Sequence, residues 1–101
     1  MPAIVVTEPS PGDTISSPVT VAGTADVFEA TVSIRILGAD GTRLADTFAT
    51  ATCGTGCRGD YSKRVTFTVS TEQEGTVMVF ESSAENGRPI NVVRVPVTLT
   101  P

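Results

Sequence analysis

Residues 31–50 read TVSIRILGADGTRLADTFAT and contain the clearest structural signal in the chain. Apolar residues alternate with polar ones from Val32 to Ile36, which predicts a β-strand that buries one face. Asp40-Gly41 tolerates positive φ and is typical of a tight hairpin turn. The stretch therefore predicts two antiparallel strands, and it indicates a β-protein rather than a helical one.

This hairpin also predicts which side chains lie opposite each other. Arg35 faces Asp46 across the two strands, on the side away from the core, so we expect a surface ion pair. Such a pair contributes about 0–1 kcal/mol, and we use it only as a marker of register. The same register sends Phe48 outward. A bulge after Gly41 would bring Phe48 inward but would bury Asp46.

Short apolar segments, each bounded by Gly, Pro, Asp or Asn, recur along the whole chain. This spacing is typical of an all-β fold, and we expect an immunoglobulin-like antiparallel β-sandwich of about seven strands. The chain of 101 residues has room for one such domain, spanning residues 1–101. The predicted strands are Ala3–Thr7, Pro18–Thr24, Thr31–Leu37, Thr42–Thr50, Tyr61–Val69, Thr76–Ser83 and Ile90–Thr100.

A second turn signal, Asn86-Gly87, predicts the register of the last two strands. A two-residue turn there places Phe80 opposite Val93 and directs both toward the core. The outer face would then carry a candidate partner surface formed by Val77, Val79, Val92 and Arg94. The alternative register buries Val77, Val79 and Val92 but turns Glu81 inward, which is costly for an unpaired carboxylate.

The two cysteines are separated by a short flexible segment. The glycines in Cys53-Gly-Thr-Gly-Cys57 let the chain fold back and bring the two sulfur atoms together. We expect a disulfide, which indicates an oxidising compartment. Reduced thiols are the alternative. A zinc site is disfavoured because the chain contains no His and only two cysteines.

The charge balance argues against several classes of partner. The chain has 7 Lys and Arg against 11 Asp and Glu, for a net charge of −4, so we expect no nucleic-acid partner. No stretch approaches the ~20 apolar residues that span a bilayer, so we expect no transmembrane segment. Met1-Pro2-Ala3 lacks a basic, apolar leader, and we expect any export signal or lipid anchor to lie outside this stretch.

No combination of residues indicates catalysis. Without His and without a Gly-x-Ser-x-Gly elbow there is no supported nucleophile, so we expect no enzyme activity and no catalytic, cofactor-binding or metal-binding residue. Two aromatic residues remain as candidate loop contacts. We expect Phe28 to plug one end of the core, with an exposed anchor for peptide or glycan as the alternative. Tyr61 should place its ring at the sandwich edge and its hydroxyl in water.

A set of segments in fixed order carries a family resemblance. They are Pro9-Ser10-Pro11-Gly12-Asp13, residues 17–25 (SPVTVAGTA), Phe28-Glu29-Ala30, Asp40-Gly41, residues 79–84 (VFESSA), Asn86-Gly87 and residues 95–99 (VPVTL). Together they resemble the immunoglobulin-like domain of bacterial spore germination. The resemblance covers nearly the whole chain and implies an exported β-sandwich, often appended to other modules of envelope proteins and lipoproteins, without catalytic or cofactor residues. The cysteine loop before Tyr61 departs from the family pattern.

These observations favour a non-catalytic extracytoplasmic module. We expect a binding or spacer domain of a bacterial envelope or spore-germination-related protein, with a protein or cell-wall component as partner. The alternative is a carbohydrate- or peptidoglycan-binding domain, whose shallow site would be formed by loops around Phe28, the cysteine turn and Tyr61. Aromatic residues make up only 5% of the chain, and sugar sites usually need stacking faces, so this alternative is weaker.

Overall fold

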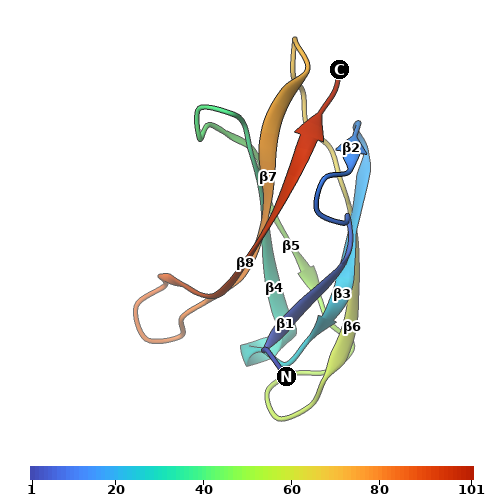
Figure 1. Ribbon diagram of the computed structural model, residues 1–101. Coiled ribbons are helices and arrows are strands. Elements are labelled where there is room, and N and C mark those ends of the chain that lie inside the picture. The colour runs from blue at the N-terminus through green and yellow to red at the C-terminus, as the bar shows by residue number, and fades with distance from the viewer.

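The computed structural model describes all residues from 1 to 101, and they form two β-sheets packed face to face (Figure 1). One sheet has three strands in the order β1-β3-β6, with β1 at Ile4–Glu8, β3 at Val19–Ala25 and β6 at Gly59–Val65. Its strands are all antiparallel.

The second sheet has five strands in the order β2-β8-β7-β4-β5. Their bounds are Thr14–Ile15 for β2, Pro89–Leu99 for β8, Gln73–Ser82 for β7, Thr31–Leu37 for β4 and Arg43–Thr50 for β5. Only the short β2 runs parallel to its neighbour. A single 3₁₀ turn, η1 (Phe28–Ala30), connects β3 to β4. No helix of the structure has the length and apolar character needed to cross a bilayer.

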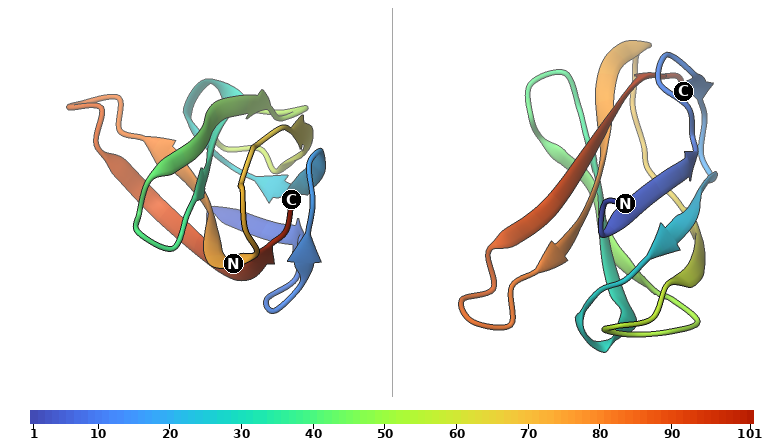
Figure 2. Two further views of the ribbon diagram at one scale, coloured as in Figure 1. Left: turned by 90° about the horizontal axis from the view of Figure 1, so that it is seen from above. Right: turned by 60° about the horizontal axis from the view of Figure 1, so that its bottom comes forward.

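The predicted all-β immunoglobulin-like sandwich is confirmed, and each of the seven predicted strands is present. The structure adds β2, whose two residues are too few to give a sequence signal. The strand predicted at Tyr61–Val69 ends at Val65, yet Phe67 and Val69 remain buried beyond it. Figure 2 shows the two layers from two further directions.

The core lies between the sheets and consists mainly of Val and Ile. A single cluster of 21 buried residues joins both layers. Residues at alternate positions of the central strands contribute most of it, because successive side chains of a strand point to opposite faces. The strand residues that are 0% exposed are Val21, Ala25, Val32, Ile34, Ile36, Val77, Val79 and Leu99.

The first hairpin has the predicted register. Arg35 lies opposite Asp46, with 3.5 Å between Nε and Oδ1, and Gly41 has a φ of 84° at the turn. Phe48 points outward and is 57% exposed. A bulge does occur, but its extra residue is Leu44, so it rotates only the first part of β5 and leaves Asp46 outside.

The predicted register of β7 and β8 is wrong. The connection is a loop over residues 83–88 rather than a two-residue turn, with the Ser83 N–H donating to the Arg88 carbonyl at 2.9 Å. Val79 lies opposite Val93, whereas Glu81 lies opposite Ile90, so β8 has one extra residue between these pairs. Asn91, with a φ of 52°, marks this bulge.

The bulge inverts which side chains of β7 face the core, and it turns Glu81 toward the inner side. An inward carboxylate is costly only when it lacks partners. Here the Phe28 N–H donates to Glu81 Oε2 at 3.0 Å, and Asn91 Nδ2 donates to Oε1 at 2.9 Å. Glu81 is also only partly buried. These bonds offset its desolvation and tie η1 to the β7–β8 hairpin, which projects from the body of the sandwich (Figure 1).

Candidate binding surfaces

The structure corrects half of the predicted partner surface. Val77 and Val79 are 0% exposed and belong to the core, because the bulge in β8 shifts the register. Val92 and Arg94 do lie on the outer side of the five-stranded sheet, where Arg94 is opposite Met78. The strip on this side of β7 therefore consists of Met78 and Phe80 in place of the two valines.

A guanidinium covers this strip. The Cζ atom of Arg35 lies 4.6 Å from the centre of the Phe80 ring, in the geometry of a cation–π contact. Phe80 is 2% exposed and Met78 6% exposed, although both point away from the core. Nε of Arg35 is buried and forms no hydrogen bond, but it lies 3.5 Å from Asp46 Oδ1 in an ion pair. The Arg35 side chain is therefore held over the aromatic ring.

We call this surface the Arg35 face, and it is defined by Arg35, Phe48, Met78, Phe80, Val92 and Arg94. Arg43 lies beside it and is 3.4 Å from Asp46. Arg35 and Arg43 both pair with Asp46, and Arg94 adds a third arginine on the same side of the sheet, a local excess of positive charge on a chain whose net charge is −4.

The two predicted loop contacts behave differently from expectation. Phe28 is 49% exposed, so it does not plug the core. It stands at η1, where Glu29 and Ala30 have φ values of 55° and 58°, a conformation that non-glycine residues rarely adopt. Phe28 is thus exposed enough to act as an anchor for peptide or glycan, which was the alternative prediction for this residue.

Tyr61 is not available for contact. It is 3% exposed, and its hydroxyl donates to the Val5 carbonyl at 3.0 Å instead of facing water. Burial raises the pKa of Tyr61 to about 12, because the phenolate would lose its hydration. A shallow site that uses Phe28 and Tyr61 together is therefore excluded by the position of the Tyr61 ring.

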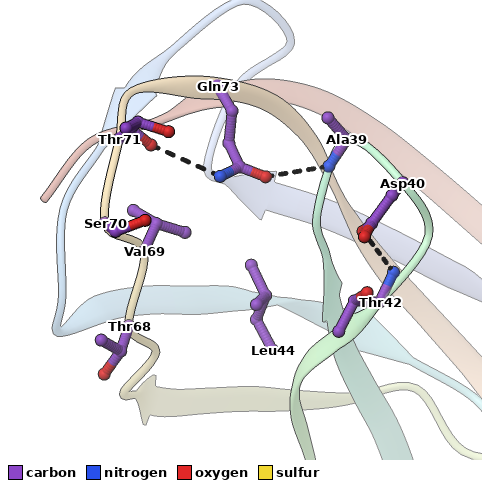
Figure 3. A pocket seen from close by; sticks show the side chains of 9 residues that line it. All are labelled: Ala39, Asp40, Thr42, Leu44, Thr68, Val69, Ser70, Thr71 and Gln73. Carbon is purple, nitrogen blue, oxygen red and sulfur yellow. Dashed lines mark hydrogen bonds between the residues drawn. The ribbon is translucent and has the colours of Figure 1, made fainter.

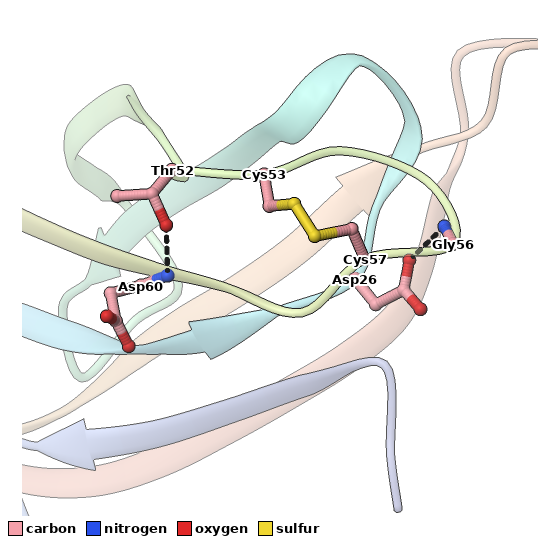
Figure 4. The surroundings of a disulfide bond; sticks show 6 residues. All are labelled: Asp26, Thr52, Cys53, Gly56, Cys57 and Asp60. Atoms are coloured by element: carbon pink, nitrogen blue, oxygen red, sulfur yellow. Dashed lines mark hydrogen bonds between the residues drawn. A yellow bond between two sulfur atoms is a disulfide. The ribbon is translucent and has the colours of Figure 1, made fainter.

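The disulfide between Cys53 and Cys57 is present, as predicted. Its loop is also held by hydrogen bonds, since the Gly56 N–H donates to Asp26 Oδ1 at 2.7 Å and the Asp60 N–H donates to Thr52 Oγ1 at 3.0 Å (Figure 4). The loop is therefore pinned to both the β3–β4 connection and the start of β6.

A cup that the sequence does not predict lies at the far end of the sandwich from this loop. Its volume is about 500 Å³, and it opens between the β4–β5 turn and the β6–β7 connection (Figure 3). We call it the Gln73 cup. Its lining residues are Ala39, Asp40, Thr42, Leu44, Thr68, Val69, Ser70, Thr71 and Gln73. The run of Thr and Ser in residues 66–71 was its only sequence signal.

The residue types that usually bind metal ions do not cluster in the structure. No three His, Cys, Asp or Glu residues come together as metal ligands, and the cysteines are joined to each other. The carboxylates are spread over turns and strand ends, where they accept hydrogen bonds from neighbouring N–H groups.

Comparison with known proteins agrees with the β-sandwich fold. The chain has the same fold as CopC from Methylosinus trichosporium OB3b, with a TM-score of 0.56, 17% sequence identity, and coverage of 100% of this chain and 95% of that one. No curated protein sequence matches it. The model of the immunoglobulin-like domain of bacterial spore germination matches residues 3–88. The chain therefore belongs to the family of immunoglobulin-like domains of bacterial spore germination.

Proposed function

We propose that this domain is a non-catalytic extracytoplasmic module of a bacterial envelope protein, and that it binds a protein partner through the Arg35 face. The observation that carries the proposal is the stack of Arg35 on Phe80 beside the exposed ring of Phe48. Arginine, aromatic residues and methionine are the types enriched where proteins bind each other.

The order of the Arg35 side chain supports this role. An arginine that must be fixed during binding loses rotamer freedom, which lowers affinity by about 0.5–1.5 kcal/mol. Here the ring of Phe80 and the carboxylate of Asp46 hold the side chain in advance. Phe48 is next to it on the edge strand β5 and offers the largest exposed aromatic surface in the chain.

Charge defines the partner further. The arginines at positions 35, 43 and 94 outnumber the single Asp46, so the face suits a partner with an apolar centre and an acidic rim. The disulfide supports an oxidising, extracytoplasmic location. Membership of the family supports an envelope protein and a link to spore germination.

Affinity capture with matched variants tests the proposal. The wild-type domain, Phe48→Ala, Arg94→Glu and Arg64→Glu would each be immobilised and exposed to an envelope extract of the source bacterium. Arg64 is exposed on β6, in the other sheet, so its variant controls for the same change of charge. We expect a protein retained by the wild type and by Arg64→Glu to be lost with Phe48→Ala and Arg94→Glu. Equal retention by all four proteins would refute the assignment.

Cell-wall binding remains the second candidate, now without the site first predicted for it. Phe28 is exposed but Tyr61 is not, so the loops near the disulfide offer one aromatic face instead of two. Sedimentation with purified peptidoglycan would distinguish the candidates. Binding that Phe28→Ala abolishes and Phe48→Ala leaves unchanged would favour the cell wall.

A further inference from the structure

The Gln73 cup is a second possible site, separate from the Arg35 face. Its volume of about 500 Å³ falls within the roughly 300–1,000 Å³ that is usual for small-molecule sites. Leu44 and Val69 provide an apolar floor, and the remaining lining groups are mainly hydroxyl, amide and carboxylate (Figure 3). Leu44 is the extra residue of the β5 bulge, so this irregularity shapes the floor.

The amide of Gln73 holds the two walls at a fixed separation. Its Oε1 accepts the N–H of Ala39 at 3.1 Å, and its Nε2 donates to the Thr71 carbonyl at 3.4 Å. The β4–β5 wall is further closed by the Gly38 N–H, which donates to the Thr42 carbonyl at 2.9 Å. The cup is therefore preorganised, which lowers the entropy lost when a ligand binds.

Some of the polar side chains that line the cup are not used by the protein. The hydroxyls of Thr68, Ser70 and Thr71 form no hydrogen bond to any lining residue drawn in Figure 3. Each can both donate and accept a hydrogen bond. Ser70 and Thr71 are neighbours on one wall of the cup, and their hydroxyls match a ligand that also carries several hydroxyls.

Asp40 adds one strong acceptor. Its Oδ1 accepts the Thr42 N–H at 2.9 Å, and this bond lowers the pKa of the Asp40 carboxyl. No Lys or Arg lines the cup, so phosphate and other anions are disfavoured. A carboxylate that accepts from neutral hydroxyls forms charge-assisted bonds, which are stronger than bonds between neutral groups.

We propose that the Gln73 cup binds a saccharide unit. The Asp40 carboxylate would accept from two sugar hydroxyls, the Thr and Ser hydroxyls would bond the others, and Leu44 with Val69 would pack against a C–H face of the ring. Because the cup is open and has no aromatic face, we expect a Kd on the order of 1 mM.

A titration followed by two-dimensional ¹⁵N–¹H NMR tests this proposal. The probes are maltotriose and N,N′,N″-triacetylchitotriose, with n-butylamine as a test for a simple cation site. Shifts should be confined to residues 39–44 and 68–73. Asp40→Asn keeps an acceptor for the turn and should weaken binding about tenfold, as should Ser70→Ala together with Thr68→Val. Asp46→Asn, on the Arg35 face, is the matched control and should bind like wild type.

Each outcome bears on the proposal, and none depends on whether the Arg35 face binds a protein. Localised shifts with either trisaccharide, weakened in the cup variants alone, would support it. The absence of shifts, shifts that map elsewhere, or equal binding by Asp40→Asn would overturn it. Tighter binding of n-butylamine than of both sugars would also overturn it, by showing that Asp40 simply attracts cations.

Discussion

Replacing Tyr61 with Phe should lower stability at neutral pH and raise it at high pH. The hydroxyl of Tyr61 donates to the Val5 carbonyl at 3.0 Å, in a part-buried position. Without the hydroxyl this part-buried hydrogen bond is lost, at a cost of about 1 kcal/mol. For a domain of this size each kcal/mol corresponds to roughly 4–8 °C in Tm. We therefore expect a clear decrease in Tm near pH 7.

At high pH the effect of Tyr61→Phe on the free energy of unfolding changes sign. The folded protein holds the pKa of Tyr61 at about 12, against an ordinary value of 10.0, so the unfolded chain ionises first. The stability from the neutral phenol is complete below pH 10 and is lost as the pH rises toward 12. A shift of about two pKa units corresponds to about 2.7 kcal/mol. Tyr61→Phe has no such loss and should equal or exceed the wild type near pH 12.

The measurement is direct because Tyr61 is the sole tyrosine and the chain has no Trp. Tyrosinate absorbance would report its pKa in the folded protein, and urea unfolding followed by circular dichroism would report the free energy of unfolding. Lys63→Gln, which removes the sole lysine of the chain, serves as the control and should keep the alkaline loss of stability. The reasoning fails if Tyr61→Phe loses stability as steeply as the wild type, or if tyrosinate forms near pH 10 before unfolding.

Three further substitutions test the fold. Glu81→Ala should lower the free energy of unfolding by about 1 kcal/mol, because it removes the hydrogen bonds from the Phe28 N–H and from Asn91 Nδ2, whereas Glu85→Ala in the exposed loop should have little effect; chemical denaturation measures both. Joint replacement of Cys53 and Cys57 by Ser should cost about 2 kcal/mol and lower Tm by about 10 °C in a thermal scan, and an unchanged Tm would contradict the stabilising role of the loop. Val79→Lys should unfold the domain as seen by circular dichroism, since it buries an unpaired charge, and a folded variant would contradict the observed register.

The sequence predicted the first hairpin well because its signals are local. Asp40-Gly41 marks the turn, the alternation in β4 marks the buried face, and Arg35 with Asp46 confirms the pairing. The only extra residue of the bulge is Leu44, so the pairing of Arg35 with Asp46 and the two sides of β4 are as predicted. Where turn chemistry and apolar alternation agree, the strand register follows from the residues themselves.

The second hairpin shows where this reasoning fails. β7 has apolar residues on both faces from Val77 to Phe80, so alternation could not identify its core side. The choice then depended on Glu81, which looked too costly to turn inward. Phe28 and Asn91 donate the hydrogen bonds that allow Glu81 to face inward. Phe28 is distant in sequence, and Asn91 lies in a bulge that has no clear sequence signal. Long-range partners of a polar group were therefore the missing information.

The same limit explains the errors in the predicted site. The incorrect register of β7 and β8 placed Val77 and Val79 on the surface. The hydroxyl of Tyr61 has its hydrogen-bond partner, the Val5 carbonyl, on a distant strand, and the local sequence around Tyr61 gives no sign of that partner. The Gln73 cup depends on two loops that are brought together only by the sandwich. Sites built from one strand were partly predictable, whereas sites built between loops were not.

The two proposed sites differ in how salt should affect them, which follows from their charges. The Arg35 face carries an excess of arginine at the surface, and screening lengths fall from about 10 Å at 0.1 M salt to about 3 Å at 1 M. Capture of a partner by that face should therefore weaken steeply as salt rises. A saccharide is neutral, and its bonds to Asp40 and the hydroxyls act at contact distance, so binding in the Gln73 cup should change little. Salt-insensitive capture would show that arginine charge is not what recognises the partner, and salt-sensitive sugar binding would show that the cup does not hold a neutral ligand.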